Sequence, residues 1–212
     1  GGRAPIDDPG AQAILAWAAA ERAALGAPAP VAGVVFVRGP IAPRTPLDLD
    51  AYHPGSDVWF YPGLTPGATP VNLTAAVHAG PVEIRDPAVS HDGRRVAFAM
   101  RRGVDDCFAL WEIGLDGAGA RQRTTPPCVA THRSHDRWPA WGPGDQLYFA
   151  STRAGHRDET GRRADVELYR LDHAEQPVRL TFTPTPELTP SFLATGEFRG
   201  SLAFTTVRQL AS

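Results

Sequence analysis

The chain has 212 residues, and its 21 basic residues nearly balance 23 acidic ones, for a net charge of −2. This balance argues against a general nucleic-acid binder or a polybasic membrane binder, whose surfaces carry excess positive charge. No stretch approaches the roughly 20 apolar residues of a membrane span. Glycine and proline number 21 each without a collagen period, and their spread between short apolar runs indicates the turns of an all-β protein.

The first 27 residues predict the one helix of the chain. Asp8 is placed as an N-cap, Pro9 suits the first helical position, and Gly26 ends the segment. Residues 28–33 include alternating prolines that cannot continue a helix, so they indicate a linker. From residue 34 to residue 212 the hydrophobic pattern changes to the period of two that is typical of β-strands.

A strand pattern recurs along this second region. Four short strands carry an aromatic residue at their third place: VVFV (34–37), VAFA (96–99), LYFA (147–150) and LAFT (202–205). The first three are followed by a second strand, VWFY (58–61), LWEI (110–113) or LYRL (168–171), and then by a third that ends at Thr74, Thr124 or Thr181. The aromatic residues Phe36, Phe98, Phe149 and Phe204 are 62, 51 and 55 residues apart, which indicates a repeated unit.

A further strand precedes three of these units. DPAVSHDG (86–93) aligns with RWPAWGPGD (137–145), which matches Pro87 with Pro139, and LTPSFLATGEFRG (188–200) is a looser third copy. A four-stranded unit of this kind cannot bury both faces alone and must stack on like units. Radial stacking gives a β-propeller with short, protected edges, whereas a β-sandwich with accidental spacing is the alternative.

The stretch PAVSHDGRRVAF (87–98) resembles the WD40-like repeat (PD40) of the TolB-type β-propellers, whose pattern is roughly P-x-x-S-P-D-G-x-x-[LIV]-x-[FY]. His91 replaces the usual second proline, and the second copy has Gly142 in place of serine with a turn one residue shorter. Both departures lie in the turn, and the resemblance covers residues 33–212. It implies an all-β fold, a partial β-propeller of about three to four four-stranded blades, preceded by the short helix.

A narrower resemblance involves VSHDGRRVAFAMRR (89–102), the segment 105–124 and LYFASTR (147–153). These stretches are similar to the propeller region of proteins of the hydrazine synthase alpha subunit type. That resemblance implies a secreted or periplasmic bacterial protein in which c-type cytochrome domains accompany the propeller, and the first 27 residues are similar to the last helix of a small cytochrome c domain. No C-x-x-C-H haem attachment motif is present, so no haem chemistry is assigned to any residue.

The length of the repeat region indicates part of a propeller. A propeller of six or seven blades at ~40–45 residues each needs roughly 240–320 residues, whereas residues 33–212 provide 180. We therefore expect a fragment of a longer protein. Its partners would be neighbouring domains of the same chain or another protein, with no nucleic acid and no membrane span.

Two groups of polar residues are candidate catalytic or metal sites. The spacing of His132, His135 and Asp136 would suit a metal ion in a helix or tight loop, but the segment falls in a connection between blades, where polar residues are expected in any case. Asp105 and Asp106 are paired carboxylates of the kind that acid–base catalysis uses, and acidic pairs before a strand are also common in turns. We favour the structural interpretation of both groups.

Two further motifs resemble sites of other kinds. Asp48 and Asp50 are spaced like calcium ligands in a long insertion of the first blade, but the third acidic position and the glycine of an EF-type loop are missing. Residues 72–74 match a glycosylation sequon and are also the normal end of the third strand, which is the interpretation that we favour.

The tryptophans divide into two groups. Trp59 and Trp111 occupy the repeat position of Tyr169, so we expect them to pack within blades. Trp138 and Trp141 flank the start of a strand nearer a rim, where they could contribute to binding.

The two cysteines bear on the compartment. Cys107 and Cys128 could pair across adjacent strands, which would imply an oxidising environment, or could remain two buried thiols. The sequence has no G-x-S-x-G, G-x-G-x-x-G or P-loop pattern. We therefore predict a non-catalytic scaffold or interaction module without catalytic, cofactor-binding or metal residues in this segment. The alternative is the propeller portion of a multidomain c-type cytochrome oxidoreductase whose redox centres lie outside these residues.

Overall fold

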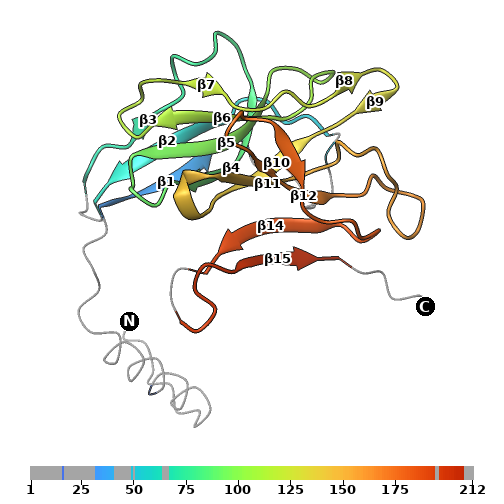
Figure 1. The fold of residues 1–212 in the computed structure, drawn as a ribbon. Helices are drawn as coiled ribbons and strands as arrows, with labels where there is room; N and C mark the ends of the chain where they lie inside the picture. The colour runs from blue at the N-terminus through green and yellow to red at the C-terminus, as the bar shows by residue number, and fades with distance from the viewer. Residues whose placement is uncertain are drawn as a thin grey trace.

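The computed structural model describes residues 32–40, 49, 51–63, 67–193 and 196–207, together with the single residue Ala16. The described chain is all-β and forms a series of small antiparallel sheets, which we call blades I to IV (Figure 1). Blade I contains β1 (Gly33–Arg38), β2 (Asp57–Pro62) and β3 (Val71–Asn72). Blade II contains β4 (Glu83–Val89), β5 (Arg95–Arg101), β6 (Ala109–Gly114) and β7 (Arg121–Gln122). Blade III contains β10 (Asp136–Trp141), β11 (Leu147–Ser151), β12 (Glu167–Leu171) and β13 (Pro177–Arg179), and blade IV contains β14 (Glu187–Phe192) and β15 (Leu202–Thr206).

One short element lies between two of these sheets, and another lies within blade III. A hairpin of β8 (Cys128–Val129) and β9 (His132–Arg133) lies between blades II and III in the chain, and a single 3-10 turn, η1 (Pro143–Asp145), joins β10 to β11. In the described part of the chain no helix is long and apolar enough to cross a membrane. Apart from Ala16, the predicted helix of residues 1–27 lies outside the described residues, as does most of the predicted linker.

The predicted repeat of strands is confirmed. The four aromatic-bearing segments fall in β1, β5, β11 and β15, the second strands are β2, β6 and β12, and the upstream segments are β4, β10 and β14. Each sheet follows the chain order, with every strand hydrogen-bonded to the next. The prediction of four strands in every blade is fulfilled only in blades II and III, because the described residues contribute three strands to blade I and two to blade IV.

The proline that recurs in the first strand of a blade marks a β-bulge. Asp86, Trp138 and Thr189 each precede such a proline and have positive φ angles of 55°, 49° and 50°. The pairing register shifts at the same place in β4, β10 and β14. A bulge accommodates an extra residue and bends the strand, and it explains why residues other than glycine occupy this otherwise unfavourable conformation.

The threonine that recurs at the end of the third strand has a backbone partner. In each of the first three blades its side-chain oxygen accepts the N–H of a residue in the second strand: Val58 to Thr74 at 3.0 Å, Leu110 to Thr124 at 2.9 Å and Leu168 to Thr181 at 2.9 Å. An amide that the short third strand leaves unpaired is satisfied in this way. The repeated threonine is therefore a structural residue.

Strand β5 is buried on both faces. Val96, Phe98 and Met100 pack in one core with residues of blade I, whereas Ala97 and Ala99 pack in a second core with residues of blade III. Val96 and Phe98 are both fully buried between the blades. Because neighbouring blades cover both faces of β5, the strand is a nearly continuous apolar run.

The sheets are arranged as consecutive blades. The first strand of blade III, β10, contacts both β4 and β14, the first strands of the blades on either side, and Figure 1 shows β14 and β15 as the layer that follows blade III. A sandwich would consist of only two sheets packed face to face, whereas blade II here has a neighbouring sheet on each of its faces. The arrangement is that of a partial β-propeller without closure among the described strands.

Candidate functional site

Many of the buried charged side chains gather at one end of the blades, which we call the loop end. There β5 and β11 end, β6 and β10 begin, and the β8–β9 hairpin projects. The buried charged residues of this end include Glu83, Arg85, Arg101, Asp136, Arg137, Asp165, Glu167 and Glu187. Since loops held by a rigid scaffold commonly carry binding or catalytic function, this end is the candidate site.

Three arginines surround one phenylalanine at the loop end. Phe108 is fully buried just before β6, and the guanidinium carbons of Arg85, Arg101 and Arg137 lie 5.2, 4.6 and 4.8 Å from the centre of its ring. Cations over an aromatic face are stabilised by the ring quadrupole, and the more so when they are desolvated. We call these four residues the Phe108 cluster.

Two carboxylates compensate the charge of the Phe108 cluster. Glu83 accepts hydrogen bonds from Arg85 Nε at 2.6 Å and Arg101 Nε at 3.0 Å. Asp86, in the bulge of β4, accepts from Arg137 Nε at 2.5 Å and Nη2 at 3.2 Å. Burial alone would raise the pKa of Glu83, but hydrogen bonds from a backbone N–H and from both arginines outweigh burial and lower that pKa. Glu83 is therefore a structural anion rather than a proton carrier.

His135 is a neutral core histidine. It is 3% exposed. Its ring Nδ1 accepts the backbone N–H of Phe108 at 3.2 Å, and its backbone N–H donates to Thr152 Oγ1 at 3.0 Å. Burial, followed by the positive charges of Arg101 and Arg137, lowers the pKa of His135 to about 3. An acceptor role for Nδ1 fits this neutral state, in which the other ring nitrogen holds the proton.

The other members of the predicted metal group have separate partners. His132 Nε2 lies 2.8 Å from Ser134 Oγ, and Asp136 accepts from Ser151 Oγ at 2.6 Å and from Arg153 Nη2 at 2.5 Å. Within residues that the structure describes, no three His, Cys, Asp or Glu side chains are grouped so that they could hold a metal ion. His132 lies in β9 and Asp136 begins β10, so this segment runs from the hairpin into blade III.

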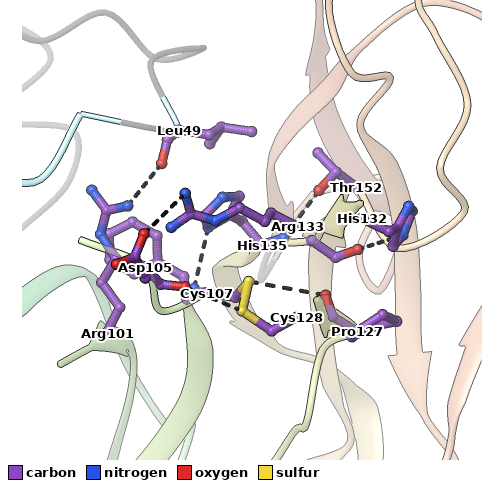
Figure 2. Close-up of a disulfide and its surroundings, with 12 residues drawn as sticks. Leu49, Arg101, Asp105, Cys107, Pro127, Cys128, His132, Arg133, His135 and Thr152 are labelled. Carbon is purple, nitrogen blue, oxygen red and sulfur yellow. Dashed lines mark hydrogen bonds and ion pairs between the residues drawn. A yellow bond between two sulfur atoms is a disulfide. The ribbon is translucent and has the colours of Figure 1, made fainter. Parts of the chain in front are cut away.

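A disulfide joins the β8–β9 hairpin to blade II. Cys107, just before β6, is bonded to Cys128, with their Cα atoms 5.8 Å apart (Figure 2). Figure 2 also shows Arg133, on the second strand of the hairpin, reaching toward Asp105 on the other side of the disulfide. The bond holds the hairpin, and with it His132 and Arg133, close to the Phe108 cluster.

A cavity of about 380 Å³ opens beside the hairpin. Its walls come from the hairpin, the start of β10, the end of β11 and the β11–β12 connection. Three histidines and four arginines line it: His132, Arg133, His135, His156, Arg157, Arg162 and Arg163. His132 and His135, two of the candidate metal ligands, therefore line a cavity that is rich in arginine.

The paired carboxylates belong to a turn. The side chain of Asp105 is 96% exposed, and its closest ionic partner is Arg133 at 3.9 Å. The N–H of Asp106 donates to the carbonyl of Gly103 at 3.2 Å, as in a turn between β5 and β6. Asp48 and Asp50, the residues spaced like calcium ligands, lie outside the described residues.

The sequon at residues 72–74 has a structural role. Thr74 is fully buried, and its hydroxyl donates to Asp57 Oδ1 at 2.8 Å in addition to accepting the N–H of Val58. Asn72 Oδ1 accepts the backbone N–H of Thr74 at 3.0 Å. The side chains of Asn72 and Thr74 therefore both form hydrogen bonds within blade I.

The tryptophans follow the prediction in part. Trp111 packs against the core between blades I and II, and Trp59 is half-buried in β2. The expected rim position is wrong for Trp141, which is 4% exposed and donates from Nε1 to the carbonyl of Ala88 at 3.1 Å. It lies in the core between blades II and III because β10 is a first strand that packs directly against β4. Trp138 is the half-buried bulge residue of β10.

The arginines of the Phe108 cluster were not predicted from the sequence. Arg85 and Arg137 occupy the same place in blades II and III, where they pair with Ala99 and Ala150 across the first two strands. The signal was present, since the segments IRDP and DRWP both carry arginine two residues before the bulge proline. An arginine in a strand normally indicates a solvent-facing position, and only the neighbouring blade shows that these two are buried.

No family model and no curated protein matches the chain. Among solved structures, a chain of hydrazine synthase from Kuenenia stuttgartiensis matches with a TM-score of 0.62 and 18% identity, over 83% of this chain and 28% of that one. Over the matched residues, this chain has the same fold as that part of the hydrazine synthase chain. TolB from Acinetobacter baumannii (TM-score 0.49, 15% identity, 90% of this chain and 41% of that one) and putative TolB from Agrobacterium tumefaciens (0.45, 18%, 66% and 44%) also match. This partial propeller spans less than half the length of each of these proteins, and at such identities the likeness concerns the fold alone.

Proposed function

We propose that the chain is a non-catalytic propeller module of a larger exported protein, which it serves as a scaffold by packing against further blades or domains. The observation that carries this proposal is the exposure of apolar residues on the end blades. Phe98 and Phe149, in blades with a neighbour on each side, are fully buried, whereas Phe204 at the same repeat position in blade IV is 43% exposed. Leu193 and Phe198 in the β14–β15 connection are also exposed.

Covering these exposed apolar side chains would stabilise the protein. Burying a phenylalanine or leucine side chain stabilises a structure by about 1.5–3 kcal/mol. A repeat blade buries its faces against like blades, so the occupant that best fits blade IV is a further blade of the parent chain. Blade I is similar, since Val34 and Val71 are 42% and 50% exposed.

The disulfide supports an exported location for the parent protein. The bond between Cys107 and Cys128 would persist in a periplasmic or extracellular environment and would be unusual in a reducing cytosol. We therefore place the parent protein in the periplasm or outside the cell.

Sedimentation velocity over a range of concentrations tests the scaffold proposal. We expect the isolated chain to self-associate, and the Phe198→Ser/Phe204→Ser variant to associate less. Val104 and Val129 are 55% and 58% exposed but lie away from the end blades, so Val104→Ser/Val129→Ser is the matched control and should behave as the wild type. A monomer at every concentration, with a sharp and concentration-independent melt, would contradict the proposal.

A second candidate is favoured by the match to hydrazine synthase: the propeller portion of a multidomain c-type cytochrome oxidoreductase, with its haem centres outside these residues. A C-x-x-C-H motif in the parent open reading frame would support this candidate. If that frame contains none on either side of the segment, the oxidoreductase candidate fails and the scaffold proposal is unaffected.

A further inference from the structure

The cavity at the loop end is unusual in its charge. Its basic side chains come from two segments, with Arg133 on β9 and Arg157, Arg162 and Arg163 in the β11–β12 connection. Among the described residues that line it, none is acidic. Four guanidinium groups around one cavity give it a positive potential that attracts anions.

Nearby carboxylates leave most of this charge uncompensated. Asp105, at 3.9 Å from Arg133, is almost fully exposed, so solvent screens this pair. Glu167 is engaged by His156 and Arg179. In the described part of the chain, the side chains of Arg162 and Arg163 form neither an ion pair nor a hydrogen bond with another side chain, and both residues are exposed.

The loop that carries these arginines is held in place. Asp158 is buried, and its Oδ1 accepts the backbone N–H groups of Arg162 at 3.2 Å and Arg163 at 3.4 Å. Gly155 has φ of 73°, and a Cβ atom there would lie 2.6 Å from the ring of His132. The β11–β12 connection therefore packs closely on the disulfide-bonded hairpin, and the cavity is built in advance of any ligand, which lowers the entropic cost of binding.

From this geometry we infer that the cavity binds a small organic polyanion with two or more phosphate or carboxylate groups. Guanidinium groups match the oxygens of phosphate and carboxylate in paired hydrogen bonds. The volume of about 380 Å³ exceeds the needs of one oxyanion and lies in the range of small-molecule sites. Few apolar side chains line the cavity, which disfavours a largely apolar ligand. The hydroxyls of Thr131 and Thr152 at its wall can serve uncharged oxygens of the ligand.

Isothermal titration of the chain with pyrophosphate and with citrate tests this inference. We expect saturable 1:1 binding of at least one probe, weakened roughly tenfold or more in Arg162→Ala/Arg163→Ala, the size expected when charge-assisted hydrogen bonds are lost. The control is Arg94→Ala/Arg199→Ala, which removes the same charge from exposed positions that do not line the cavity and should bind as the wild type. Whichever probe binds more tightly assigns the ligand to phosphates or to carboxylates.

Two results would overturn the inference. One is the absence of saturable binding of either probe up to about 10 mM, a limit beyond which affinity is too weak for a specific site. The other is an equal loss of affinity in both double variants, which would show that net charge rather than the cavity attracts the probes. Near-ultraviolet circular dichroism verifies the fold of each variant, and Arg133→Gln provides a second test from the opposite wall. Failure here leaves the scaffold proposal intact, because that proposal concerns the end blades.

Discussion

The threonine at the end of the third strand offers a test that can be repeated in three blades. Replacement by valine keeps the shape of the side chain but removes the hydroxyl. In Thr74→Val the N–H of Val58 loses its acceptor and Asp57 loses a donor. In Thr124→Val the fully buried N–H of Leu110 is left without its acceptor, and the buried carboxylate of Asp136 loses a hydrogen bond.

These contacts predict an order of effects. A buried donor without a partner costs about 1–3 kcal/mol, and with the second bond we expect Thr74→Val and Thr124→Val each to lower the free energy of unfolding by about 2–4 kcal/mol. Thr181 is only half-buried, and its hydroxyl accepts one hydrogen bond, from the N–H of Leu168, so Thr181→Val should cost about 1 kcal/mol. Threonine-to-serine variants keep the hydroxyl and should lose only the methyl group, about 0.8 kcal/mol.

Equilibrium unfolding in urea, at one low protein concentration for all variants, measures these differences. The reasoning is refuted if Thr124→Val stays within about 0.5 kcal/mol of the wild type, the range of ordinary surface substitutions. It is also refuted if serine and valine cost the same at position 74 or at position 124, since the loss there would then come from packing and not from the hydroxyl.

Three further predictions concern the loop end. The Cys107→Ser/Cys128→Ser variant, whose bond spans 21 residues in the wild type, should lose about 3 kcal/mol of stability in thermal or urea unfolding, and a reductant that leaves the wild-type melt unchanged would contradict this. Glu83→Gln leaves two buried arginines without their anion and should cost about 3–5 kcal/mol, so a melt like that of the wild type would show that the cluster does not need this charge. Burial and the negative charge of Glu167 raise the pKa of Asp165 to about 6. The folded state therefore holds this proton more tightly than the unfolded state does. As a result, the free energy of unfolding falls as the pH rises from about 4 to 6. Asp165→Asn should remove that decrease and gain up to about 3 kcal/mol at pH 7, and an unchanged pH profile of unfolding would argue against this assignment.

The strands and turns of blades II and III could be predicted from the sequence because their causes are local. Alternation of polar and apolar residues sets the strands, and the turn at Asp92 is closed by its own neighbours, with Ser90 Oγ and the N–H of Arg94 both donating to its carboxylate. The repeated proline and threonine could be aligned without knowing their roles, because each blade uses them in the same way. The repeat and the stacking of its units could therefore be predicted from local patterns alone.

Which side chains of neighbouring blades contact one another became clear only from the folded chain. The contact of Asp86 with Arg137 joins residues 51 positions apart, and that of His91 Nε2 with the carbonyl of Trp141 joins residues 50 apart. A hydrophobic pattern tells which face of a strand is buried, but it does not tell which side chain of the next blade will meet it. Contacts between neighbouring blades produce the burial of Trp141, the arginines around Phe108 and the basic cavity. These features could therefore not be predicted from the sequence alone.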